Sequence, residues 1–123
     1  MNTVEEHLEK ARGNLAFLDT IEAQVDRFAD WAVVVLFYHA LHLASAAIHA
    51  QGADHGRSHD SRQRRLEQII SPAGAEEYER LYSRSRLYRY DAVQCTRSEY
   101  VRLRDTSFGI LSGELRAQLG DLL

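Results

Sequence analysis

The feature that most constrains the fold is a mostly apolar run, WAVVVLFYHALHLASAAIHA, at positions 31–50. The run is about as long as a membrane span, yet it carries three histidines and a tyrosine and follows an acidic segment. Because apolar side chains cover most of its helical circumference, such a helix needs neighbours on several sides. We therefore predict a helix over about 28–50 at the centre of a helical bundle, with no membrane span.

A first helix is predicted over 3–20, before the central one. Thr3 followed by Glu6 has the capping-box pattern that satisfies free amides at a helix start. The apolar residues that follow recur at alternating spacings of four and three, which is typical of one amphipathic helical face. That face consists of Val4, Leu8, Ala11, Leu15 and Leu18.

Three more helices are predicted after the central one. Ser58 caps the third, and Ser71 ends it and caps the fourth, which has Pro72 in its first turn and runs to about residue 89. Thr96 with Glu99 opens the fifth, which extends toward Gly120. Its apolar positions are Tyr100, Leu103, Ile110, Leu111 and Leu115. Since no stretch alternates with period two, we predict an all-α, up-and-down bundle of about five helices, one domain over 1–123.

Charge is distributed unevenly along the chain, whose net charge is −3. Residues 1–54 carry a net −5, residues 55–104 a net +4 and residues 105–123 a net −2. The positive middle segment is consistent either with binding to a phosphate-bearing partner or with helix faces that carry Glu–Arg ion pairs. The single cysteine, Cys95, and the acidic N-terminus favour a cytoplasmic protein without disulfides.

Helical phase predicts which polar side chains face inward, because successive residues are 100° apart. In the third helix His59 and Arg62 share a side with Leu66, whereas Arg64 and Arg65 fall outside it and are predicted to be solvated. In the fourth helix the apolar stripe contains Arg89 and is flanked by Arg86.

A buried guanidinium needs an acceptor, which Asp60, Asp91, a helix C-terminus or a ligand phosphate would supply. One alternative is therefore that groups of the protein itself accept the hydrogen bonds of these arginines. The other is a polar pocket at one end of the bundle, built by His59, Arg62, Arg86, Arg89 and Tyr90.

Three segments in this order and spacing resemble the HEPN family (higher eukaryotes and prokaryotes nucleotide-binding). They are DWAVVVLFYHALHLASAAIHAQG, SHDSR and YERLYSRSRLYRYD. The resemblance implies an up-and-down helical bundle that dimerises and a place in prokaryotic toxin–antitoxin or antiviral defence systems. Many HEPN members are metal-independent ribonucleases. Their active site usually contains an arginine that is followed, after four to six residues, by a histidine. Residues that match the family are Ser58, His59, Arg89, Tyr90 and Asp91.

The chain departs from the family's catalytic pattern, because no arginine stands five to seven residues before any of its histidines. We therefore predict a non-catalytic module that acts as a homodimer and binds a nucleotide, RNA, or a partner protein such as a nucleotidyltransferase or defence effector. Arg57, Arg62, Arg64 and Arg65 are the predicted RNA contacts.

The alternative is a ribonuclease in which His59 moves the proton while Arg86 and Arg89, beside Tyr90, hold the phosphate. His59 could equally lock the bundle by bonding Asp91 or a tyrosine of the fourth helix.

Neither a metal site nor a cofactor site is predicted. His39, His42 and His49 could share a face of the central helix, but no cysteine pair or suitably spaced carboxylate completes a tetrahedral set. We interpret them as neutral core histidines bonded to backbone or tyrosine hydroxyl groups. Cys95 has no histidine near it in sequence, so it is not predicted to be a nucleophile.

Overall fold

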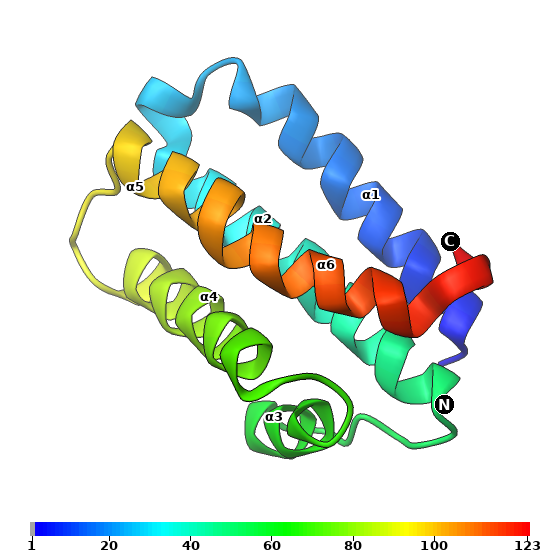
Figure 1. The fold of residues 1–123 in the computed structure, drawn as a ribbon. Coiled ribbons are helices and arrows are strands. Elements are labelled where there is room, and N and C mark those ends of the chain that lie inside the picture. The colour runs from blue at the N-terminus through cyan, green and yellow to red at the C-terminus, as the bar shows by residue number, and fades with distance from the viewer. Residues whose placement is uncertain (1) are drawn as a thin grey trace.

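The computed structural model describes residues 2–123, which form helices and connecting loops without a strand. Figure 1 shows the bundle with its two termini at the same end. The prediction of an all-α bundle is confirmed. In chain order the elements are α1 (Val4–Glu22), α2 (Val25–Ala50), α3 (His59–Glu67), α4 (Pro72–Tyr90), α5 (Arg97–Arg102), a π-helical segment (Leu103–Ser107), α6 (Phe108–Leu119) and a final 3₁₀ turn (Gly120–Leu122).

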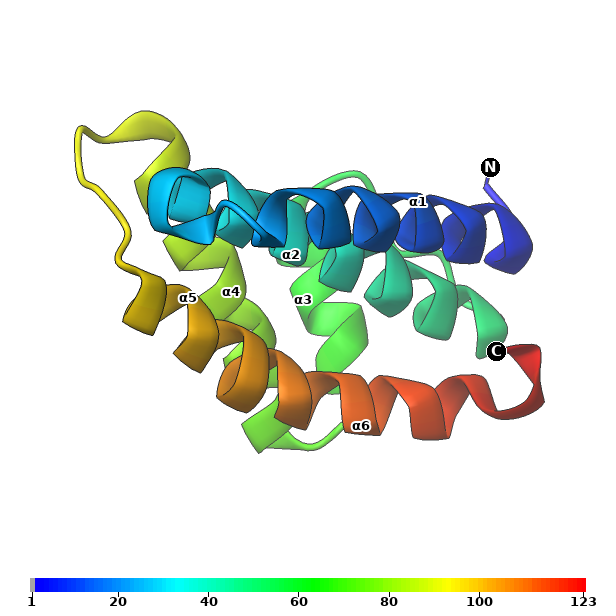
Figure 2. The same cartoon turned by 90° about the horizontal axis from the view of Figure 1, so that it is seen from above.

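Helix α2 is the centre of the fold, as its composition predicted. It packs against α1, α4, α5 and α6, and sixteen of its residues are buried. Figure 2, seen from above, shows α1 and α6 as separate layers with α2 between them. The helix is long and apolar enough to cross a membrane, but 78% of its most apolar window is buried inside the bundle. Its apolar surface is therefore used for packing against the other helices.

The predicted helix starts are largely confirmed. The Thr3 and Glu6 capping box forms in full, and Ser58 and Ser71 cap α3 and α4. Helix α2 begins at Val25 rather than at 28, and the non-helical backbone of Phe28 marks a kink there. The capping box predicted at Thr96 forms only in part: Thr96 accepts from the amide of Glu99. The Glu99 carboxylate instead pairs with Arg84 and Arg102.

The predicted fifth helix is interrupted by the π-helical segment, which changes its buried face. Leu103, Ser107, Leu111, Leu115 and Leu119 are all buried, at a constant spacing of four. In a regular α-helix that spacing would drift around the axis by about 40° at each step. A π turn winds more loosely and offsets part of this drift. The prediction of Ile110 as a core residue was wrong, because it is 45% exposed.

Leu15, predicted on the buried face of the first helix, is also partly exposed, at 38%. It lines a hollow of about 140 Å³ that also contacts Leu8, His39, Leu43 and Arg116. The hollow forms because α1 packs mainly on α2, so the edge of its apolar face that points toward α6 is not covered.

Candidate nucleic-acid interface

His59 begins α3 and joins it to α4. Its Nε2 lies 2.6 Å from Oε2 of Glu79, and its ring stacks on that of Tyr82 with centroids 3.4 Å apart and planes 8° apart. The prediction that His59 faces the bundle is confirmed, since only 14% of its side chain is exposed. The predicted partner Asp91 was wrong: the acceptor is Glu79, and the contact with the α4 tyrosine is a stack.

Both nitrogens of His59 are withdrawn from solvent. Nε2 is engaged by Glu79, and Nδ1 is buried with no hydrogen-bond partner among residues 2–123. A general acid or base has to reach the proton it transfers, directly or through one water molecule. The arrangement therefore holds helices together but presents no free imidazole nitrogen to a substrate.

Arg86 and Tyr90 lie at an open hollow on the outer side of α4. The Arg86 guanidinium donates to the Tyr82 hydroxyl at 3.3 Å and lies 5.4 Å from the ring centroid of Tyr90. Tyr90 is 70% exposed. The hollow measures about 400 Å³ and is lined by Tyr82, Ser83, Arg86, Leu87, Tyr90 and Asp91. It therefore offers a largely exposed aromatic ring beside a guanidinium.

Arg89 connects α4 to the central helix. Its Nη1 donates to the hydroxyl of Tyr38 at 2.7 Å, and its guanidinium lies 5.1 Å from the ring centroid of Tyr90. Its Nε is buried without a hydrogen-bond partner in the described part of the chain. The acceptor is thus a hydroxyl rather than Asp91, which leaves the charge of this partly buried arginine uncompensated.

Arg62 belongs to a different environment from the Arg86 hollow. Its Nε donates to Oγ of Ser45 in α2 at 3.2 Å, and its Nη2 lies 3.5 Å from Nδ1 of His55. It faces the bundle as predicted, but its partner is not Asp60. The predicted five-residue pocket therefore forms only in part. Arg86 and Tyr90 line it, His59 and Arg89 adjoin it through tyrosine rings, and Arg62 lies outside.

The arginines of residues 55–104 divide into two groups by their ion pairs. Five have a carboxylate within 4.0 Å: Arg80, Arg84, Arg97, Arg102 and Arg104. Among residues 2–123, no carboxylate lies within that distance of the other six. These six are Arg57, Arg62, Arg64, Arg65, Arg86 and Arg89, the arginines that the sequence analysis assigned to phosphate contacts.

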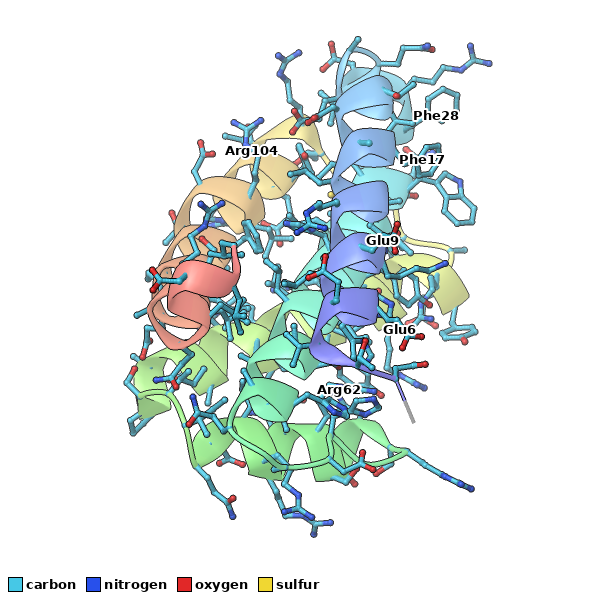
Figure 3. The ribbon with its side chains drawn as sticks, turned by 90° about the vertical axis from the view of Figure 1, so that its right-hand side faces the viewer. Glu6, Glu9, Phe17, Phe28, Arg62 and Arg104 are labelled. Atoms are coloured by element: carbon cyan, nitrogen blue, oxygen red, sulfur yellow. The ribbon has the colours of Figure 1, made fainter. Side chains whose placement is uncertain are left out.

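The two interpretations of the positive segment thus apply to different parts of it. Glu or Asp carboxylates pair with Arg80 and Arg84 in α4, with Arg97 and Arg102 in α5, and with Arg104 in the π-helical segment. The unpaired arginines lie on α3, on the loop before it and on the second half of α4. Arg64 and Arg65 are exposed as predicted, and Arg57 is exposed as well. In Figure 3 long nitrogen-tipped side chains project outward at the α3 end of the bundle.

Sequence reasoning missed Glu79, Tyr38 and Ser45, which are the partners of His59, Arg89 and Arg62. Helical phase places a residue on a side of its own helix, but it does not say which residue of a neighbouring helix lies opposite. Only Tyr38 could have been suspected from the sequence, since at 100° per residue it lies on the same side of the central helix as Trp31, His42 and His49. Nothing in the sequence pointed to Glu79, because it lies outside the apolar stripe of α4.

Comparison of the chain with protein-family models and with curated proteins found no match. The HEPN resemblance and the roles that it implies therefore stay predictions.

Proposed function

We propose that this chain is a HEPN-like module that binds RNA or a nucleotide and does not cleave it. The proposed binding surface is formed by α3, the loop before it and the second half of α4. The observation that carries the proposal is the set of six arginines without a carboxylate partner on these elements, of which Arg57, Arg64, Arg65 and Arg86 are exposed. An unpaired guanidinium keeps its charge available for bidentate hydrogen bonds to phosphate.

The hollow beside Tyr90 favours a nucleotide as the ligand rather than phosphate alone. Single-stranded nucleic acids bind where aromatic rings stack with bases next to cationic groups that follow the backbone. Tyr90 supplies an exposed ring, and Arg86 lies against it. A base stacked on Tyr90 would thus place its phosphate within reach of Arg86.

The environment of His59 favours binding over cleavage. Its Nε2 is bonded to Glu79 and its Nδ1 is buried, so the ribonuclease alternative lacks an accessible acid or base at this position. That alternative would require α3 to move away from α4 before a ribose hydroxyl could reach the ring.

Salt-dependent binding tests the proposal. Fluorescence anisotropy with a labelled single-stranded RNA compares the wild type with Arg86→Ala and with Arg64→Ala/Arg65→Ala. Each lost phosphate contact should reduce the slope of log affinity against log salt by about 0.7 for a single strand. Arg80→Ala and Arg97→Ala are matched controls, because both residues are already ion-paired. Equal losses in the controls and the test variants would refute the proposed surface.

Cleavage is tested separately with labelled RNA in the presence of a chelator. We expect no cleavage by the wild type. If the wild type cleaves and folded His59→Ala does not, the ribonuclease alternative is correct and the non-catalytic part of the proposal fails.

We extend the proposal to a homodimer in the cytoplasm of a prokaryote, in a toxin–antitoxin or defence-type system, as the HEPN resemblance implies. Light scattering should then give twice the 14.1 kDa mass of the chain, and a monomer mass would contradict the dimer. The product of a neighbouring gene, such as a nucleotidyltransferase or defence effector, should co-purify with it.

A further inference from the structure

Four of the six histidines gather at the end of the bundle where α1 begins and α2 ends. Figures 1 and 2 both show these two helix ends beside each other. His7 comes from α1, His42 and His49 from α2, and His55 from the loop before α3. The ring centroid of His7 lies 5.4 Å from that of His42, 5.2 Å from that of His49 and 5.1 Å from that of His55, and the last two are 5.0 Å apart.

Three of these histidines are close enough to share a metal ion. One ring nitrogen from each of His7, His49 and His55 lies within 4.8 Å of the others. With metal–nitrogen bonds of about 2.0–2.1 Å, ligand nitrogens on a tetrahedral zinc ion are about 3.3 Å apart. Modest rotations of the rings would therefore close the site, and His55 lies on the loop before α3 rather than within a helix.

Two nitrogens in the cluster have no hydrogen-bond partner among the described residues. They are Nε2 of His7 and Nε2 of His49, and both are buried. His7 is only 3% exposed. Burying a polar nitrogen without a partner is costly, and a metal ion would satisfy both atoms at once.

His42 is placed to orient His7. The Nδ1 atoms of the two rings are 3.1 Å apart, so one donates a hydrogen bond and the other accepts it. When His7 binds a metal through Nε2, its Nδ1–H becomes the donor to His42, which is the usual arrangement behind a metal-bound histidine.

We propose that His7, His49 and His55 together bind one Zn²⁺ ion, with His42 as a positioning residue and the fourth coordination position open to water. Imidazole ligands without thiolates suit zinc. The site joins the start of α1 to the end of α2 and to the loop before α3. Sequence spacing relates only the histidines within the central helix, whereas His7 and His55 come from other elements that the fold brings to them.

Some charged groups near the site disfavour a bound cation, and others favour it. The Arg62 guanidinium approaches His55 Nδ1 to 3.5 Å and opposes a cation there. Asp54 and Glu6 supply negative charge near His55 and His7 respectively. Figure 3 labels Glu6 and Arg62, which lie at this end of the molecule. Arg62 would have to turn away from His55 when that ring binds the metal, while keeping its bond to Ser45.

A zinc titration of untagged protein, stripped with a chelator and competed against a chromophoric zinc indicator, tests the site. We expect one tightly bound Zn²⁺ per chain. His49→Ala and His55→Ala should each weaken binding at least about ten-fold. His59→Ala and Cys95→Ser, which lie outside the cluster, should bind as the wild type does. Co²⁺ bound in place of zinc should show the intense visible absorption of a tetrahedral site.

Each result decides the proposal. The absence of stoichiometric binding by the wild type would overturn it. So would unchanged affinity in both His49→Ala and His55→Ala with helical circular dichroism intact, or a loss of binding in Cys95→Ser alone. His55 lies in a loop outside the core, so its variant tests the site even if His49→Ala does not fold. Because no RNA is present, the outcome is independent of the proposed RNA binding.

Discussion

Nε2 of His59 lies 2.6 Å from Oε2 of Glu79, and this contact joins the first residue of α3 to the middle of α4. The stack of His59 on Tyr82 adds a second contact between the same two helices. Helix α3 has only nine residues, and Leu66 is its single buried residue. A short helix with so little apolar surface depends on such contacts for its position.

Removing this contact should destabilise the fold. We expect His59→Ala to lower the free energy of unfolding by about 1–3 kcal/mol, because it removes a partly buried hydrogen bond and an aromatic stack. Urea denaturation measures the change, and a double-mutant cycle with Glu79→Ala should give a coupling energy of about 0.5–3 kcal/mol. Arg86→Ala is the control and should stay within about 0.5 kcal/mol of wild type. A fully stable His59→Ala variant would contradict the locking role.

Gly74 should tolerate alanine poorly although it lies in a helix. A Cβ there would be 2.2 Å from Oε2 of Glu114, whose carboxylate accepts hydrogen bonds from the amide and hydroxyl of Ser71. We expect Gly74→Ala to lower the free energy of unfolding by about 1 kcal/mol, because these capping contacts are disturbed.

Gly113→Ala is the matched comparison, since a Cβ there meets nothing within 4 Å. It should raise the free energy of unfolding by up to about 1 kcal/mol, the helix propensity of alanine over glycine. Equal stabilisation by both substitutions in thermal denaturation would show that Glu114 moves aside without loss.

His39 should make the fold sensitive to acid. Its Nδ1 donates to the carbonyl oxygen of Ala11 at 2.7 Å, and burial lowers its pKa below the ordinary value of 6.5. As the pH falls through 6.5, the unfolded chain takes up a proton that the folded chain resists, so stability decreases. Urea midpoints measured in chelator between pH 8 and 5 should therefore fall less for His39→Asn than for the wild type. A parallel fall in the two proteins would exclude His39 as a cause.

Cys95 should react slowly with alkylating agents. Burial raises the pKa of its thiol, and the thiolate is the reactive form. At pH 7 we expect iodoacetamide to modify the folded protein at least about ten-fold more slowly than the chain unfolded in urea. Mass spectrometry over time measures both rates, and similar rates would show that the thiol is as accessible and as readily ionised in the folded protein as in the unfolded chain.

The sequence alone determined the local structure. Thr3, Ser58 and Ser71 cap the helices that they were predicted to cap, because a capping bond joins residues only three apart. The central place of α2 followed from its apolar circumference. Helical phase correctly predicted that Arg62 faces the bundle and that Arg64 and Arg65 face solvent, since the phase depends only on the helix that carries the residue.

Only the tertiary structure decided which residues meet. His7 and His42 are 35 positions apart, and Arg89 and Tyr38 are 51 apart, so no local pattern predicts either contact. The separation of paired from unpaired arginines likewise depends on which carboxylates neighbouring helices bring close. The π-helical segment keeps the buried residues of the last helix facing the core. With that segment present, Ile110 faces solvent instead of the core. In each case the physical reason is the same: these contacts depend on how separate helices pack against one another, and periodicity describes only one helix at a time.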